Sequence, residues 1–296
     1  MIGYPFKIIL KYSLLSISIL PNTFLEWIAS AVTPLIVLLA KKEVRILEEN
    51  IFHIYGLPKH SSFAKKFKMQ VIHSQIVTAL ETIKGTQRPN TITYIGLEKL
   101  QEIAKNMESY EKGQILITGH IGAWELIAYC MAHSTNKTFY ALAKPARSQL
   151  ITKALEQHRK NMKIKVLWTN KNTFVKEMLT ALKEKQWLSF VMDQKPKGRI
   201  GPTVSFFDRK VAFVSGPAQM SIRFKAPIIS VFCVREGTMK YRFISKEIIP
   251  ADHSISDEQQ LCQIMASQIE EAIKLYPEQW CWNYKRWKYA TNDKTS

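Results

Sequence analysis

The sequence lacks the cysteine arrangement of a zinc site or of a disulfide framework. Its four cysteines, Cys130, Cys233, Cys262 and Cys281, are scattered and form no C-x-x-C pair. The zinc-binding pattern H-E-x-x-H is also missing, so we expect no metal. Apolar neighbours indicate that Cys130 and Cys233 are small core residues. The lack of a disulfide framework fits a reducing compartment.

Acidic residues are scarce. The 296 residues contain 24 Asp and Glu against 42 Lys and Arg, which gives a formal net charge of +18. Such an excess predicts an anionic partner, either nucleic acid, an anionic membrane or an acidic carrier protein. Charge alone does not choose among these partners. The hydrophobic content of 46% excludes a disordered chain.

No small-residue cleavage site follows the apolar N-terminal segments, so a secretory signal peptide is not expected. Two apolar runs, 8–20 and 24–40, are separated by Pro21, and neither is a clean stretch of the roughly 20 apolar residues that span a bilayer. They form either two buried core helices or a membrane anchor that spans or lies in the interface.

We favour an anchor over residues 1–40. Lys41, Lys42 and Arg45 follow it directly. The positive-inside rule then places the rest of the chain on the cytoplasmic face of the inner membrane.

Beyond residue 41 no segment rich in Pro, Gly or Ser divides the chain, so residues 41–296 are expected to form one domain. An amphipathic helix comes first, a second helical stretch follows over about 62–83, and strands and helices then alternate four times. "APIISVFCV" and "MKYRFIS" predict an antiparallel hairpin, and Ser256 is a candidate N-cap for a long final helix. The pattern predicts an α/β layered sandwich, a mostly parallel central sheet flanked by helices and preceded by N-terminal membrane-associated helices.

Polar residues follow several of the predicted strands. His120, Lys144 and Asp193 each come at or near the carboxyl end of one strand. Ligands of open α/β sheets bind outside these ends, so the three side chains predict a pocket there.

The segment "GHIGAWE" places Glu125 five residues after His120, just inside the next helix. Because Gly122 lets the chain turn, the Glu125 carboxylate can reach back to the imidazole, fix its tautomer and leave the other nitrogen as a general base. From the spacing alone, a core histidine and a carboxylate that complements the helix dipole remain open.

Several motifs in order resemble one family. "GHIGAWE", "VMDQKPKGRIGPTVSFFDRK", "SGPAQMSIRFKAPIISVF" and "PEQWCWNYKRWK" resemble blocks of the bacterial late lipid A acyltransferases, the lauroyl and myristoyl transferases, within the H-x4-E glycerolipid acyltransferase superfamily. The resemblance covers residues 40–290. Ala123 stands where the family usually has Asn, and Asp208 where it commonly has Gly, and neither departure removes His120 or Glu125.

The resemblance implies transfer of a fatty acyl chain from an acyl thioester to a hydroxyl of a lipid A precursor, without a cofactor. Acyl carrier protein is the expected donor, and the acceptor is a phosphorylated glycolipid. His120 would be the base and Glu125 its orienting partner. Backbone amides near Gly122 are candidate donors to the oxyanion.

Four further residues are candidates for substrate binding. Arg159 could hold an acceptor phosphate or support the fold, and Lys144 and Arg147 could form a phosphate patch or a solvated face. Asp193 could orient a site residue or cap a turn. Two alternatives stay open: an acyltransferase for another glycolipid or an aminolipid, and a non-catalytic basic protein of membrane surfaces or nucleic acid. No nucleic-acid module is recognisable, so a nucleic-acid partner is not expected.

Overall fold

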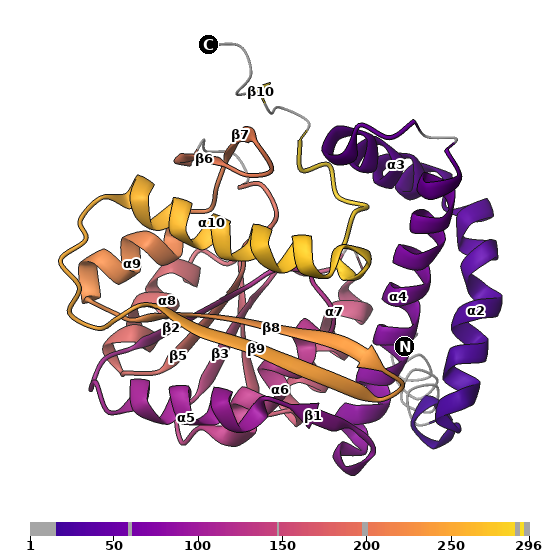
Figure 1. The fold of residues 1–296 in the computed structure, drawn as a ribbon. Helices are drawn as coiled ribbons and strands as arrows, with labels where there is room; N and C mark the ends of the chain where they lie inside the picture. The colour runs from indigo at the N-terminus through magenta and orange to yellow at the C-terminus, as the bar shows by residue number, and fades with distance from the viewer. Residues whose placement is uncertain (1–15, 59–60, 147, 197–200, 288–290, 293–296) are drawn as a thin grey trace.

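The computed structural model describes residues 16–58, 61–146, 148–196, 201–287 and 291–292. Its centre is a seven-stranded sheet with the strand order β1-β9-β8-β2-β5-β3-β4 (Figure 1). The strands are β1 (Thr93–Ile95), β2 (Gln114–Thr118), β3 (Phe139–Ala143), β4 (Ile164–Trp168), β5 (Trp187–Val191), β8 (Ile228–Gly237) and β9 (Lys240–Ile249).

The sheet is mostly parallel, which confirms the predicted α/β class. β8, β2, β5, β3 and β4 run in one direction, whereas β9 returns antiparallel to β8 as the predicted hairpin and β1 pairs parallel to β9. A small second sheet, which the sequence pattern did not indicate, contains β6 (Thr203–Ser205), β7 (Arg209–Ala212) and β10 (Thr291–Asn292).

Helices cover both faces of the large sheet. Successive side chains of a strand point to opposite faces, so the apolar strands present apolar residues on both faces. Ile115 and Ile117 of β2 belong to one core cluster with helices α8, α9 and α10, whereas Leu116 belongs to the other with α5 and α6. Figure 1 shows α9 and α10 on one side of the sheet and α5 and α6 on the other. The helices are α5 (Leu97–Glu108), α6 (Trp124–Ser134), α7 (Gln149–Asn161), α8 (Phe174–Lys183), α9 (Gly216–Phe224) and α10 (Glu258–Leu275).

Helix α10 begins at a different cap from the one predicted. The Asp257 carboxylate accepts the backbone N–H of Gln259, so Asp257 rather than Ser256 is the N-cap. Both residue types accept such a bond, and their order along the chain does not show which one the helix uses.

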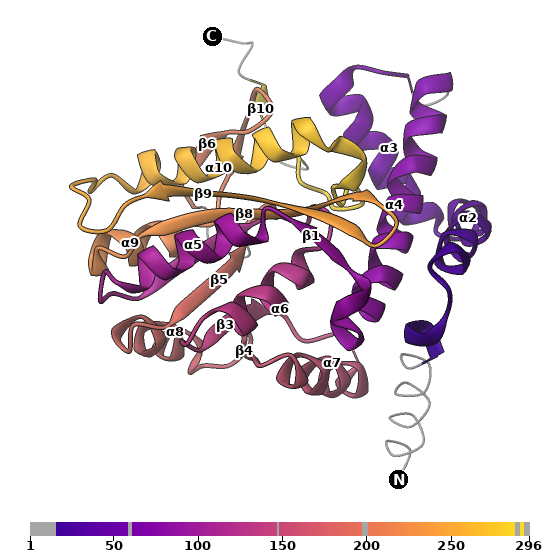
Figure 2. The same ribbon diagram turned by 60° about the horizontal axis from the view of Figure 1, so that its bottom comes forward.

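Three N-terminal helices lie beside one end of the sheet: α2 (Asn22–Leu39), α3 (Lys41–Tyr55) and α4 (Ser62–Gln87). Figures 1 and 2 both show α2 alongside α4, and α3 crosses near one end of the pair. Helix α3 ends at Gly56, which has the left-handed φ of 65° common at helix ends.

Helix α2 is long and apolar enough to cross a membrane by length and composition. It begins directly after Pro21, as expected, and most of the first apolar run, 8–20, lies outside the described residues. One stripe of α2, Leu25, Ala29 and Thr33, is buried against the body of the protein. The helix is therefore docked on the domain along one face, and Trp27 and Leu38 on another face are more than 60% exposed.

Candidate active site

His120 and Asp193 meet at the carboxyl ends of two adjacent parallel strands, β2 and β5. The imidazole Nδ1 lies 2.7 Å from Asp193 Oδ1, and the indole Nε1 of Trp280 donates to the other carboxylate oxygen, also at 2.7 Å. Asp193 is buried, whereas the His120 side chain keeps 24% of its surface exposed. A buried carboxylate therefore fixes the orientation of a histidine whose other nitrogen, Nε2, can take a proton.

Charges around the pair favour its ionised form. Burial disfavours protonated His120, but the charge and hydrogen bond of Asp193, with a contribution from Glu125, outweigh it and raise the pKa of His120. Burial likewise opposes the Asp193 carboxylate, but His120 and the Trp280 hydrogen bond lower the pKa of Asp193. The carboxylate therefore stays charged while the histidine titrates.

Three backbone hydrogen bonds hold the loop after His120. The N–H of Gly122 donates to the Gln279 carbonyl, that of Ala123 to the Cys233 carbonyl, and that of Cys281 to the His120 carbonyl. Gly122 has a φ of 55°, and a Cβ there would lie 2.2 Å from the Cys233 oxygen, so only glycine fits. The amides of Gly122 and Ala123 are already used, which argues against the expectation that they stabilise an oxyanion.

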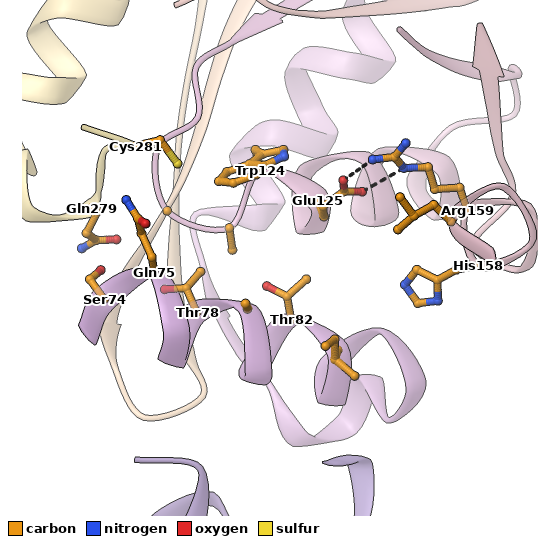
Figure 3. A pocket seen from close by; sticks show the side chains of 15 residues that line it. Ser74, Gln75, Thr78, Thr82, Trp124, Glu125, His158, Arg159, Gln279 and Cys281 are labelled. Carbon is orange, nitrogen blue, oxygen red and sulfur yellow. Dashed lines mark hydrogen bonds and ion pairs between the residues drawn. The ribbon is translucent and has the colours of Figure 1, made fainter. Parts of the chain in front are cut away.

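The Glu125 carboxylate makes a contact different from the predicted one. It accepts from Arg159 Nη2 at 2.5 Å and from Arg159 Nε at 3.4 Å, a two-point pairing between α6 and α7 (Figure 3). The predicted orienting contact on the imidazole is made by Asp193 instead. Glu125 lies in the first turn of α6, as expected, but its side chain points toward α7.

A cavity of about 310 Å³ lies next to these residues. Gly122, Ala123, Trp124 and Glu125 form one wall, and the Trp124 ring packs edge-on against the His120 ring with centroids 5.0 Å apart. Glu125 and Arg159 therefore line the cavity directly, whereas His120 is not among its described lining residues and borders it through Trp124. Figure 3 shows the other walls, which come from α4, α7 and the C-terminal segment: Ser74, Gln75, Thr78, Ala79, Thr82, Ile83, Leu155, His158, Arg159, Gln279 and Cys281.

The structure groups four of the predicted residues and separates another. Glu125 and Arg159 line the cavity, and His120, paired with Asp193, packs against the lining residue Trp124. Lys144 is exposed at the end of β3 and is not among the described lining residues. Arg147 lies outside the described residues.

Sequence reasoning missed the contribution of α4 to the cavity, because Ser74, Gln75 and Thr78 belong to no motif. It also missed Trp280 as a partner of Asp193, although the C-terminal block that contains this tryptophan was one of the motifs with a family resemblance.

Comparison with known proteins agrees with the geometry. A search among curated proteins found no match. The family model described as bacterial lipid A biosynthesis acyltransferase matches residues 6–289. Because that match spans nearly the whole sequence, the chain belongs to the bacterial lipid A biosynthesis acyltransferase family and is an acyltransferase.

Proposed function

We propose that the protein transfers a fatty acyl chain from acyl carrier protein to a hydroxyl of a lipid A precursor, with His120 as the general base. The observation that carries this proposal is the 2.7 Å contact between His120 Nδ1 and the buried Asp193 carboxylate, because it leaves Nε2 as the proton acceptor. Family membership supports an acyl donor and a lipid acceptor in general.

The proposed reaction proceeds by proton transfer and substitution at the thioester carbon. His120 Nε2 takes the proton of the acceptor hydroxyl while the hydroxyl oxygen attacks the thioester carbonyl. The tetrahedral oxyanion then collapses, the carbon–sulfur bond breaks, and the leaving thiolate takes the proton back from the imidazolium. Asp193 stabilises that imidazolium throughout, as the orienting carboxylate does in a serine protease triad.

Glu125 and Arg159 act as a second unit in this proposal. The carboxylate holds the guanidinium at the cavity wall, and its negative charge also supports protonated His120. An arginine held in this way presents its remaining N–H groups to an anion. Arg159 is therefore our candidate for binding an acceptor phosphate.

The charge and the N-terminal helix support the identities of the two substrates. A net charge of +18 suits an acidic carrier protein and a phosphorylated lipid. Residues 1–40 serve as the anchor and residues 41–296 as the acyltransferase domain at the cytoplasmic face of the inner membrane, which brings the site to a lipid that remains in the bilayer. The anchor is not independent of the domain, since α2 packs against α4.

The test uses the purified full-length protein with acylated carrier protein and a lipid A precursor. Transfer should need both substrates, and His120→Ala should lose on the order of 10³ in turnover, because general-base catalysis typically contributes 10²–10⁴. A folded His120→Ala variant within about tenfold of the wild type would contradict the proposed base. Transfer only to another glycolipid or an aminolipid would keep the mechanism but change the acceptor.

A further inference from the structure

A second cavity, of about 350 Å³, lies between the three N-terminal helices. We call it the α2–α4 groove. Its walls are the C-terminal end of α2, the first half of α3 and one face of α4. Most of its lining is aliphatic: Ile36, Ala40, Val44, Leu47, Ile72, Ile76, Ala79 and Leu80. Its polar lining residues are Glu43, Gln75 and Asn283. Because no lysine or arginine among the described residues lines it, the groove suits a hydrocarbon chain and not an anionic headgroup.

Several polar contacts fasten the N-terminal part of α2 to the domain. Lys84 Nζ donates to the Leu20 carbonyl and to Asn22 Oδ1, and Arg235 pairs with Glu26. The buried stripe of α2 runs to Thr33 and stops there.

Beyond Thr33, the same spacing of four leads to Val37, which is partly buried against the core, with Ile36 and Ala40 beside it on the helix surface. These two residues line the groove instead of packing into the core. Pro34, which has no N–H to donate to the preceding turn, lies where the fully buried stripe ends.

The groove adjoins the active-site cavity. Gln75 and Ala79, one turn apart on α4, line both spaces. The C-terminal segment does likewise, with Cys281 lining the active-site cavity and Asn283 lining the groove. A lipid with its polar part near Arg159 therefore has an apolar space for one chain on the next face of the same helix.

The groove also borders the apolar surface of α2. Leu35 and Leu38, near its lining residue Ile36, are 54% and 64% exposed. If this surface faces lipid, a chain could pass from the bilayer into the groove without crossing water. A chain carried by a soluble acidic protein would arrive from the aqueous side.

We propose that the α2–α4 groove binds one of the acyl chains already present on the acceptor lipid and so positions the acceptor hydroxyl toward His120. The inference rests on the proposed function for the identity of the acceptor. Its first test fills the groove with Ala40→Trp. The matched control is Leu39→Trp, which adds the same side chain at the neighbouring residue, outside the lining of the groove.

The measurement is KM for the lipid A precursor and for the acylated carrier protein in mixed micelles. Each methylene group kept out of the groove loses about fourfold in affinity. We therefore expect Ala40→Trp to raise KM for the acceptor by about tenfold or more and to leave KM for the donor within about twofold. Leu39→Trp should change neither constant by more than about twofold. An unchanged acceptor KM in Ala40→Trp, or a rise confined to the donor, would overturn the inference.

A binding test without turnover separates this inference from the proposed function. A lipid A precursor with a photoactivatable diazirine in one acyl chain is mixed with the full-length protein, irradiated and mapped by peptide mass spectrometry. We expect cross-links on α3 and α4 residues of the groove, lost in Ala40→Trp and kept in Leu39→Trp. If these cross-links form in a protein that does not acylate the precursor, the groove stands and the proposed function fails. Cross-links confined to other surfaces, or equal labelling by a diazirine phospholipid that the precursor does not displace, would refute the acceptor-chain site.

Discussion

His120 Nδ1 and Asp193 Oδ1 lie 2.7 Å apart although 73 residues separate them in the chain. The contact forms because β2 and β5 are adjacent and parallel, so their carboxyl ends deliver both side chains to one place. Trp280 closes the carboxylate from the other side. A histidine held in this way resembles the base of a catalytic triad more than a core histidine, since part of its ring faces solvent.

The first prediction concerns Asp193→Asn. An amide of the same shape can leave the imidazole in the wrong tautomer and provides no charge to stabilise the imidazolium. We expect turnover to fall by about 10³–10⁴, as in a protease triad that loses its orienting carboxylate. The His120→Ala/Asp193→Asn double variant should be little worse than His120→Ala, because members of one catalytic unit are strongly non-additive. Multiplicative losses in proteins with unchanged melting curves would show that the two residues act independently.

The second prediction is the pH dependence of kcat/KM. The base must be neutral, so activity should rise with pH through the pKa of His120, which the structure places above the ordinary value of 6.5. Asp193 stabilises the protonated ring, and removing its charge therefore lowers that pKa. In Asp193→Asn the remaining activity should show its acidic limb at lower pH than the wild type does. A limb that stays in place would mean that another group titrates.

The third prediction concerns the Glu125–Arg159 pair. Arg159→Lys keeps the charge but loses the two-point geometry. We expect KM for the phosphorylated acceptor to rise about tenfold, and Glu125→Gln to raise it less, because the arginine keeps its charge but loses its support. Lys160→Gln, the exposed basic neighbour on α7, is the control and should stay within about twofold. An effect of Arg159→Lys only on kcat would point to a role at the reacting carbonyl instead.

The sequence predicts the sheet edge of the site because short apolar strands end in His120 and Asp193. It does not predict that these two strands are neighbours, since strand order depends on contacts far apart in the chain. The predicted contact of the Glu125 carboxylate with the His120 imidazole was wrong for a related reason. Spacing shows that Glu125 starts a helix, but Arg159, which neutralises it, comes from the next helix along the chain.

The α4 residues that line the cavity were not predicted from local sequence patterns. Ser74, Gln75 and Thr78 occur in a helix that belongs to no motif, and polar helix residues are generally expected to face solvent. They face the cavity because α4 packs beside the end of the sheet, close to α6. Glu26 is a charge that interrupts an apolar run of the sequence. The structure explains this charge by the ion pair of Glu26 with Arg235.

The fourth prediction tests the ion pairs that Arg235 makes with Glu26 and Glu81. Glu81 is fully buried, and its carboxylate accepts from Arg235, from Tyr241 Oη and from the Met239 N–H. Arg235→Met leaves this carboxylate without its counter-charge, which costs about 3–5 kcal/mol for a buried pair. We expect the melting temperature to fall by about 10 °C. Arg242→Met, which breaks an exposed pair with Glu236, is the control and should leave melting unchanged. Equal melting temperatures for the two variants would mean that the ion pairs of Arg235 do not stabilise the docked position of α2.

The last prediction concerns the outer face of α2. Phe24, Trp27, Leu35 and Leu38 recur at helical spacing on this face and are between 41% and 64% exposed. Its inner stripe is covered by the domain, so α2 cannot be surrounded by lipid while it stays docked, and we expect it to lie in the interface. Trp27→Ser/Leu38→Gln should weaken binding of the full-length protein to vesicles of an anionic phospholipid by at least about tenfold without changing its melting temperature, because exposed residues contribute little to folding. Val175→Gln alters an equally exposed apolar residue on α8, far from α2 in Figure 2, and should bind like the wild type. Vesicle binding that is unchanged in the α2 variant would mean that this face does not contact the membrane.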